Sequence, residues 1–212
     1  MKTSFKCAPM ILGLALFASA CGTAKVYTTP DFAKMQPRSV LVLPPENTTS
    51  NTEVVEKAYP FVFSKLAQRG YYVIAPELAM QLFVANKLND PGRLNTLPTG
   101  KFSEVFGVDA VLKTKVTEWS SKYIVLSSTV NVGFEMSLID CRSGKLLWSH
   151  KNTLSKAPDN GGGGGGGLAG LIGGLVNTAV HAAVTPYEPI ASENAGIMMS
   201  TIPLGAVNVK KQ

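Results

Sequence analysis

The clearest pattern along the chain is a strict alternation of apolar and polar residues in its second half. From Val130 to Leu138, every second residue is apolar and the residues between them are Asn, Gly, Glu and Ser. A period of two predicts a strand with one face in the core, which we place at 123–140. Weaker alternation predicts strands at 109–119 and 145–154. The short turn Asp140–Gly144 would join the last two strands as a hairpin.

Two continuous apolar runs, 39–44 and 71–75, predict buried strands nearer the N-terminus. The sequence further predicts helices near 53–69, 76–86, 101–106 and 188–201. Pro60 would kink or restart the first of them, and Asp90-Pro91-Gly92 breaks the pattern after the second. In the second helix, Leu78, Leu82 and Ala85 form an apolar stripe that we expect to face the core. Together these elements predict an α/β (α+β-like) fold.

The predicted domain is single and spans residues 38–205, with a short tail at 206–212. It holds a mixed five-stranded sheet covered by helices. A chain of this length can bury about 70% of the surface that its unfolded form exposes, so its core needs no metal or disulfide.

The N-terminus reads as a targeting segment rather than as part of the fold. Lys2 and Lys6 precede an apolar stretch, and the small residues Ala18-Ser19-Ala20 come directly before Cys21. Ordinary signal cleavage would leave Cys21 as an incidental thiol. We favour a bacterial lipobox, in which residues 1–20 are a lipoprotein signal peptide cleaved between Ala20 and Cys21. Cys21 would then carry diacylglycerol and an N-acyl chain, and several acyl chains anchor a protein stably.

Cleavage of the signal peptide would change both the net charge and the number of cysteines of the protein. Removal of Lys2 and Lys6 lowers the formal net charge from +6 to +4. No cluster of basic and aromatic residues remains, so we expect no binding of nucleic acid. Gly22 follows the cysteine and favours the outer membrane, and residues 21–37 would form the lipid anchor and tether. Cys141 is then a lone thiol, expected to be buried.

The sequence contains no recognisable catalytic, metal-binding or phosphate-binding motif. His150 and His181 have no metal-ligating neighbour three or four residues away, so we predict a strand surface residue and a helix residue. The carboxylates are scattered, and the run Gly161–Gly167 lacks the Lys and Ser or Thr of a phosphate loop. We therefore expect no cofactor, no metal ion, no catalytic residue and no enzyme, although a hydrolase whose site is assembled from distant residues remains an alternative.

The glycine-rich part of the chain has two readings. Residues 160–167 form a linker, and residues 168–184 are apolar with embedded Gly and Ala. The second segment could be a helix packed on the sheet or in a subunit interface, or it could contact a membrane. With edge strands that need cover, this segment makes a homo-oligomer a further expectation.

Several of these pieces, in this order, resemble a known periplasmic domain. A strand ending in Leu43-Pro44-Pro45-Glu46-Asn47 is followed by a helix and Gly70–Ile74, and Phe106–Leu112 then leads into Val116–Trp119. The hairpin residues Leu138–Asp140, Ser143–Lys145 and Trp148 match as well. The domain is shared by the curli-secretion lipoprotein, the N-terminal domain of the Tol β-propeller protein and lipoprotein activators of peptidoglycan synthases.

Over residues 21–205 the chain resembles the small Gram-negative lipoprotein family typified by a meningococcal genome-derived antigen. The resemblance implies a lipid-anchored protein of the outer membrane, facing the periplasm or the cell surface. It would act through contacts with envelope proteins, as an accessory of a transport or envelope-assembly system. A regulator of a peptidoglycan synthase is the alternative. The pore-forming hairpins of the curli-secretion protein are not evident in this sequence.

Overall fold

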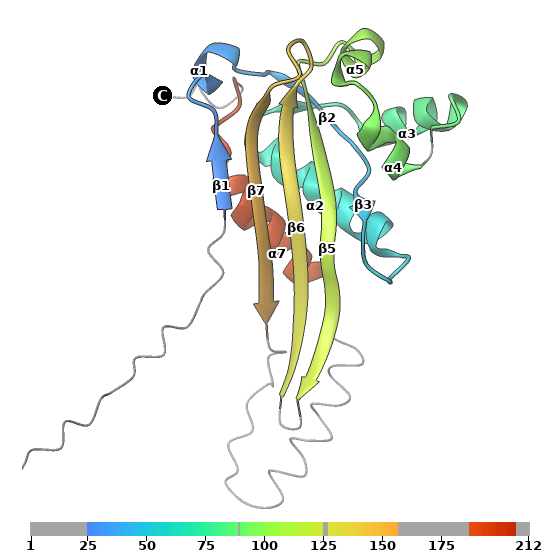
Figure 1. Ribbon diagram of the computed structural model, residues 1–212, viewed down its shortest axis with the longest axis vertical. Helices are drawn as coiled ribbons and strands as arrows, with labels where there is room; N and C mark the ends of the chain where they lie inside the picture. The colour runs from blue at the N-terminus through green and yellow to red at the C-terminus, as the bar shows by residue number, and fades with distance from the viewer. Residues whose placement is uncertain (1–24, 89, 125–126, 157–186, 207–212) are drawn as a thin grey trace, which may run out of the picture.

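The computed structural model describes residues 25–88, 90–124, 127–156 and 187–206. Within them a mixed sheet has the strand order β1-β7-β6-β5-β2-β4, and β3 pairs with β5 beside this path (Figure 1). The strands are β1 (Lys25–Thr28), β2 (Ser39–Val42), β3 (Glu46–Asn47), β4 (Tyr72–Val73), β5 (Ala110–Ile124), β6 (Ser127–Asp140) and β7 (Leu146–Lys156). The helices are α1 (Phe32–Met35), α2 (Val54–Gln68), α3 (Pro76–Ala85), α4 (Pro91–Thr96), α5 (Thr99–Phe106) and α7 (Glu188–Ser200).

The three long strands form an antiparallel meander, and their register places the alternating apolar residues on one face. Leu112 lies opposite Leu138, which in turn lies opposite Trp148. The shorter β2 pairs in parallel with β5, and β4 pairs in parallel with β2. A register shift between Val116 and Glu118 lies opposite Gly133. A Cβ atom at Gly133 would come within 2.8 Å of two threonine hydroxyls, so only glycine fits this crossing.

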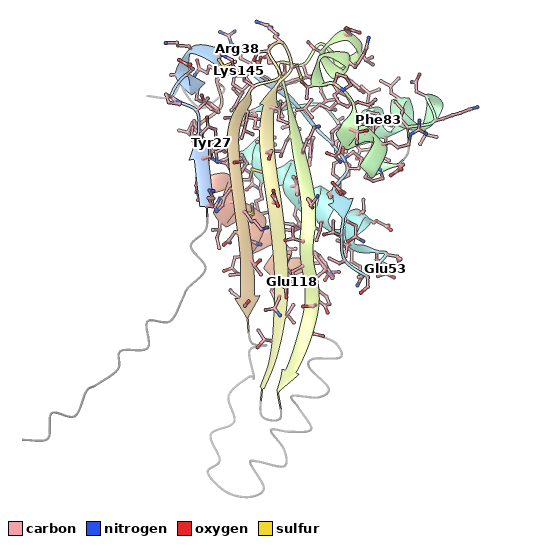
Figure 2. All side chains as sticks on the ribbon, viewed as in Figure 1. Tyr27, Arg38, Glu53, Phe83, Glu118 and Lys145 are labelled. Carbon is pink, nitrogen blue, oxygen red and sulfur yellow. The ribbon has the colours of Figure 1, made fainter. Side chains whose placement is uncertain are left out.

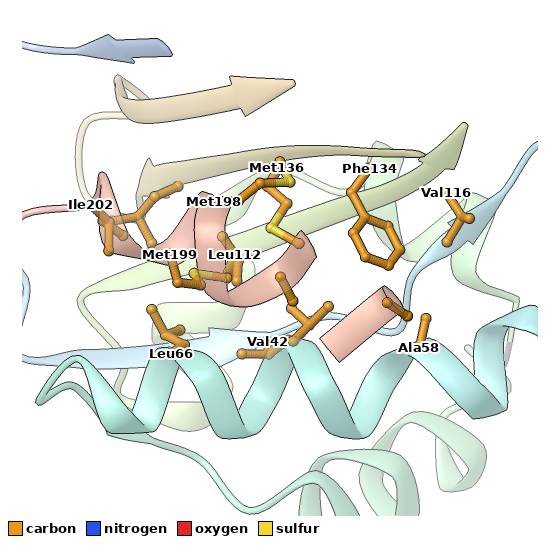
Figure 3. Packing of buried hydrophobic residues seen from close by; sticks show 14 of the residues in the cluster. Val42, Ala58, Leu66, Leu112, Val116, Phe134, Met136, Met198, Met199 and Ile202 are labelled. Carbon is orange, nitrogen blue, oxygen red and sulfur yellow. The ribbon is translucent and has the colours of Figure 1, made fainter. Parts of the chain in front are cut away.

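The helices α2 and α7 cover this apolar face and close the main core (Figure 3). Both present residues that are completely buried, such as Ala58 and Leu66 from α2 and Met198 from α7. Pro60 lies inside α2, whose helical span continues through it. Apolar burial of this kind is the main force that stabilises a fold.

The opposite face of the sheet is covered only in part. The short helices α3, α4 and α5 pack over β2 and the start of β5 and form a second, smaller cluster around Leu41, Leu43, Phe83 and Phe102. In Figure 1 these three helices lie together at one upper side of the sheet, whereas none of the described helices covers the lower parts of β5, β6 and β7 on this face. Among the described residues, two long helices therefore cover one face of the sheet, and three short helices cover part of the other.

The predicted α/β domain with a mixed sheet is confirmed, and each of the five predicted strands is present. The number five was too low, because the two-residue β3 and the four-residue β1 also join the sheet. Neither has an alternating burial pattern that a sequence could reveal. Asp90-Pro91-Gly92 does not only interrupt a helix. Pro91 starts α4, and the Asp90 carboxylate accepts a hydrogen bond from Gly92 N at 2.8 Å.

Part of the expected tether at residues 21–37 is folded onto the domain. β1 pairs antiparallel with β7 from Lys25 opposite Lys151 to Thr28 opposite Trp148. The buried Phe32 of α1 then joins the main core. β1 is held by backbone hydrogen bonds to the edge of the sheet, and all four of its side chains are exposed. Because no side chain of β1 is buried, its sequence does not distinguish an edge strand from a tether.

Candidate functional site

Several of the residues singled out in the sequence lie outside the described residues. These are Ala20 and Cys21, the linker 160–167, the apolar segment 168–184 and His181. The lipid anchor and the role of the glycine-rich segment therefore stay predictions. The other candidates can be placed.

Asp109, in the Phe106–Asp109 step, is a structural residue that joins β2 to β5. Its Oδ2 accepts hydrogen bonds from the backbone N–H groups of Arg38 and Ser39, at 3.0 and 3.1 Å, and from the Ser39 hydroxyl at 3.1 Å. Burial acts to raise the carboxyl pKa, but these hydrogen bonds and the nearby Arg142 outweigh it and hold the pKa of Asp109 below its usual value. Gly107 precedes it with a φ of 66° and ends α5.

The prediction that His150 is a strand surface residue was wrong. Its side chain is only 3% exposed and lies under α7. Nδ1 lies 3.2 Å from the Thr201 hydroxyl, which also accepts a hydrogen bond from the Trp148 indole N–H. The error arose because a histidine at an inward position of a strand looks polar in sequence. Here the end of α7 supplies its partners.

These surroundings leave His150 poorly suited to catalysis. Burial lowers the pKa of its imidazole, and the carbonyl of Met198, 3.4 Å from Nδ1, only partly opposes this shift. Its contacts with Thr201 and Met198 tie α7 to the sheet, and the ring does not line any of the hollows described below. The residue therefore stabilises the packing of α7.

Cys141 is buried, as the sequence predicted. Burial raises the pKa of its thiol to about 11, and the nearby carboxylates of Asp140 and Asp109 act in the same direction. A thiol with such a pKa is almost entirely protonated at neutral pH and is a poor nucleophile. Among the residues that the structure describes, no group of three or more His, Cys, Asp or Glu side chains is placed to hold a metal ion.

The surface around α3 is the most distinctive feature of the described chain. A hollow of about 370 Å³ between α3 and α5 is lined almost entirely by apolar and aromatic side chains, among them Phe83, Phe102 and Phe106. The Phe83 ring packs edge-on against the other two, at centroid distances of 6.4 and 5.7 Å. A second hollow of about 450 Å³ lies between α2 and α3, against Tyr59, Phe63 and Met80. Thus α3 has an apolar hollow on each side.

Large apolar side chains are also exposed around these hollows. Leu78 and Val84 on α3 are 53% and 59% exposed, and Val105 on α5 is 63% exposed. The expected stripe of Leu78, Leu82 and Ala85 was wrong, because α3 buries Ala79 and Phe83 instead. We call α3, the two hollows and Val105 the α3 surface. Its sequence signal is a short helix with apolar residues on more than one face.

A different surface lies on the part of the sheet that none of the described helices covers. The register places Lys25, Lys151, Glu135, Lys115 and Glu46 side by side across five strands. Lys151 pairs with Glu135 at 3.5 Å, and Lys115 pairs with Glu46 at 3.4 Å. Figure 2 shows how side chains project from this face between the labelled Tyr27 and Glu53. Apart from Lys25 and Lys151, neighbouring residues in this row carry opposite charges, which is typical of solvated sheet faces.

No helix in the part of the chain that the structure describes has the length and apolar character needed to cross a bilayer.

Comparison with known proteins places the chain in a family. The model of the family described as "Putative lipoprotein GNA1162-like" matches residues 27–206. The "Putative lipoprotein NMB1124/NMB1162" of Neisseria meningitidis serogroup B is 32% identical over 177 residues, which are 82% of this chain and 80% of that protein.

Two solved structures are similar to this chain to different degrees. The crystal structure of lipoprotein GNA1162 from Neisseria meningitidis has a TM-score of 0.56 at 29% identity, and the match covers 71% of this chain and 100% of that one. A PelC dodecamer from Paraburkholderia phytofirmans has a TM-score of 0.48 at 20% identity, with 84% and 95% covered.

Proposed function

The chain belongs to the family described as "Putative lipoprotein GNA1162-like", and we propose that it is a lipid-anchored outer-membrane protein that acts without catalysis by binding envelope proteins through its α3 surface. The family supports a lipoprotein of the cell envelope. The finer role, as an accessory of a transport or envelope-assembly system, is our inference. In this proposal the acyl groups are attached to Cys21 after cleavage behind Ala20.

The observation that carries the proposal is the α3 surface. Two apolar hollows of about 370 and 450 Å³ flank one helix, and Leu78, Val84 and Val105 remain exposed beside them. Concave apolar surfaces with aromatic walls are where binding energy concentrates in protein interfaces. Isolated exposed apolar residues are ordinary, but a cluster around preformed hollows favours a partner that inserts apolar side chains.

The test is site-specific photo-crosslinking in living cells. A photoreactive amino acid replaces Val84 on α3, and the matched control replaces Ile197, an exposed apolar residue on α7 at the opposite face of the sheet. We expect a discrete crosslinked species at position 84 and none at 197. A crosslink at both positions, or at neither, would contradict the α3 surface as the binding site.

The identity of the crosslinked partner separates the remaining alternatives. A component of a transporter or secretion system supports the proposed role. A penicillin-binding protein would favour the regulator of a peptidoglycan synthase, and a second copy of this chain would make the α3 surface a homo-oligomer interface. Fatty-acid labelling tests the anchor separately, because Cys21→Ala should abolish it.

A further inference from the structure

The position of β1 limits where the membrane can lie. β1 is the edge strand of the sheet, and Lys25 at its start pairs with Lys151 in the middle of β7. Cys21 precedes Lys25 by four residues. We propose that the edge of the domain formed by β1 and the adjoining part of β7 lies against the lipid surface that holds Cys21, so that the α3 surface points away from it. This inference rests on the proposed lipidation of Cys21.

The first step of the argument is the length of chain between anchor and fold. Four residues span at most about 14 Å even when fully extended, because each residue adds at most ~3.6 Å. However residues 22–24 are arranged, the start of β1 therefore stays within that distance of the acylated cysteine. A lipoprotein with a long tether could turn any of its faces to the membrane, but this chain has no such freedom.

The second step is the chemistry of this edge. All four side chains of β1 are exposed, including Val26 and Tyr27, each at 44%. Figure 2 shows the labelled Tyr27 at the outer edge of the sheet. Tyrosine is enriched at membrane interfaces, where its ring is apolar and its hydroxyl is hydrated.

The charge of the edge fits the same surface. Lys25 and Lys151 lie directly opposite each other, and Glu135 is the carboxylate that approaches Lys151, at 3.5 Å. Only Lys151 of these two lysines pairs with Glu135, so the edge carries more positive than negative charge. A basic edge is attracted to the phosphates of anionic phospholipids. The short connection would bring these lysines close to the headgroups.

The third step is the width of the sheet. Four strand spacings separate β1 from β2, about 19 Å at the usual ~4.8 Å per spacing. The helices of the α3 surface pack over β2 and the start of β5. Figure 1 shows β1 at one side of the sheet and α3 at the other. When the β1 edge is held at the membrane, the α3 surface lies on the far side and is open to a partner in the adjoining aqueous space.

The experiment uses the full lipidated protein in vesicles of phosphatidylethanolamine and phosphatidylglycerol with brominated acyl chains. A fluorophore is attached to Val26→Cys on β1 or, as a matched control, to Val105→Cys on α5, since both valines are exposed. Cys141 is buried and should remain unlabelled. We expect the bromines to quench the label at position 26 and to leave the label at position 105 bright.

The outcomes separate this proposal from the one on which it rests. Mass spectrometry of the same preparation measures acylation of Cys21, so an unmodified cysteine refutes the anchor and with it the orientation. Acylated protein that is quenched equally at both positions, more at 105, or at neither overturns the orientation alone. Self-association through β1, seen as crosslinking between copies at position 26 without quenching, overturns it as well.

A second pair of variants tests the lysines. Lys25→Gln combined with Lys151→Gln should reduce quenching at position 26 in these vesicles, whereas Lys101→Gln on α5 should not. Undiminished quenching in the double variant would remove the two lysines from the membrane-facing surface.

Discussion

The two helical layers of this domain cover the same sheet but are built differently. The layer of α2 and α7 consists of two long helices with fully buried faces, and its buried amide Asn194 is bonded to β6 and β7. The layer of α3, α4 and α5 consists of helices of ten, six and eight residues. It borders open apolar hollows and leaves Leu78 and Val84 exposed.

This difference indicates a division of roles within one domain. A close-packed layer with fully buried apolar faces specifies and stabilises the fold. A layer with open apolar hollows contributes less to stability, because its side chains lack contacts on one side. Such a layer is suited to gain those contacts from a partner. Substitutions in the two layers should therefore differ in both stability and binding.

The largest contrast should come from two matched phenylalanines. Phe134 is completely buried under the α2 and α7 layer, and Phe83 is nearly buried but borders the hollow beside α3. Phe134→Ala should lower the free energy of unfolding by about 3–5 kcal/mol. Phe83→Ala should cost less, because its contacts are already incomplete. Urea denaturation followed by tryptophan fluorescence measures both, and an equal or larger loss for Phe83→Ala would contradict the comparison.

A smaller loss of stability is expected at the junction of β2 and β5, the strands that support both helical layers. Asp109→Asn should lower the free energy of unfolding at pH 7 by about 1–2 kcal/mol, because an amide oxygen accepts these hydrogen bonds less strongly than a carboxylate. The folded pKa of Asp109 is lowered. Its contribution is therefore present above the pKa of the unfolded chain and is lost as pH falls through the folded value.

The pH series supplies the check for Asp109. In the acid range the wild-type protein should lose stability more steeply than Asp109→Asn. Asp31→Asn is a suitable control, because that exposed carboxylate pairs with Lys34 on the surface and its loss should have little effect. Parallel pH profiles for wild type and Asp109→Asn would show that the carboxylate charge does not stabilise the β2–β5 junction.

His150 should make the α7 layer sensitive to mild acid. Burial lowers the pKa of its imidazole from its ordinary value of 6.5. The folded protein then binds fewer protons than the unfolded chain in this range, so stability is full above pH 6.5 and declines as pH falls through the lowered folded value. Thermal unfolding between pH 7.5 and 5 should show this decline in wild type and less of it in His150→Leu. A His181→Gln variant shows whether the other histidine causes it instead.

Much of the fold could be predicted because it depends on local patterns. The alternation in β6 reflects burial of one strand face, and the apolar run in β2 reflects burial of both. Gly107 ends α5 in the left-handed backbone conformation that glycine favours. β1 and β3 could not be predicted in this way. They are short, and they join the sheet through hydrogen bonds to strands that are distant in sequence.

The candidate surface was harder to predict than the fold. The sequence shows that α3 is apolar, but not which of its sides meets the sheet. A helix with apolar residues on several faces has no single periodicity, so the predicted stripe at Leu78 and Leu82 differed from the buried face at Ala79 and Phe83. The burial of His150 likewise depends on α7, which follows it by about forty residues in the chain.

The smallest stability effect should accompany the largest effect on binding. Leu78→Asp and Val84→Asp replace exposed side chains of α3, so each should change the free energy of unfolding by no more than about 0.5 kcal/mol. Each places a charge beside an apolar hollow, where a partner would have to desolvate it, so crosslinking from Val105 on the same surface should be lost. Ile197→Asp on α7 is the matched control and should leave that crosslinking intact. If the α3 variants instead strongly lower the free energy of unfolding while the crosslinking persists, α3 belongs to the core. The distinction between a stabilising and a binding layer then fails.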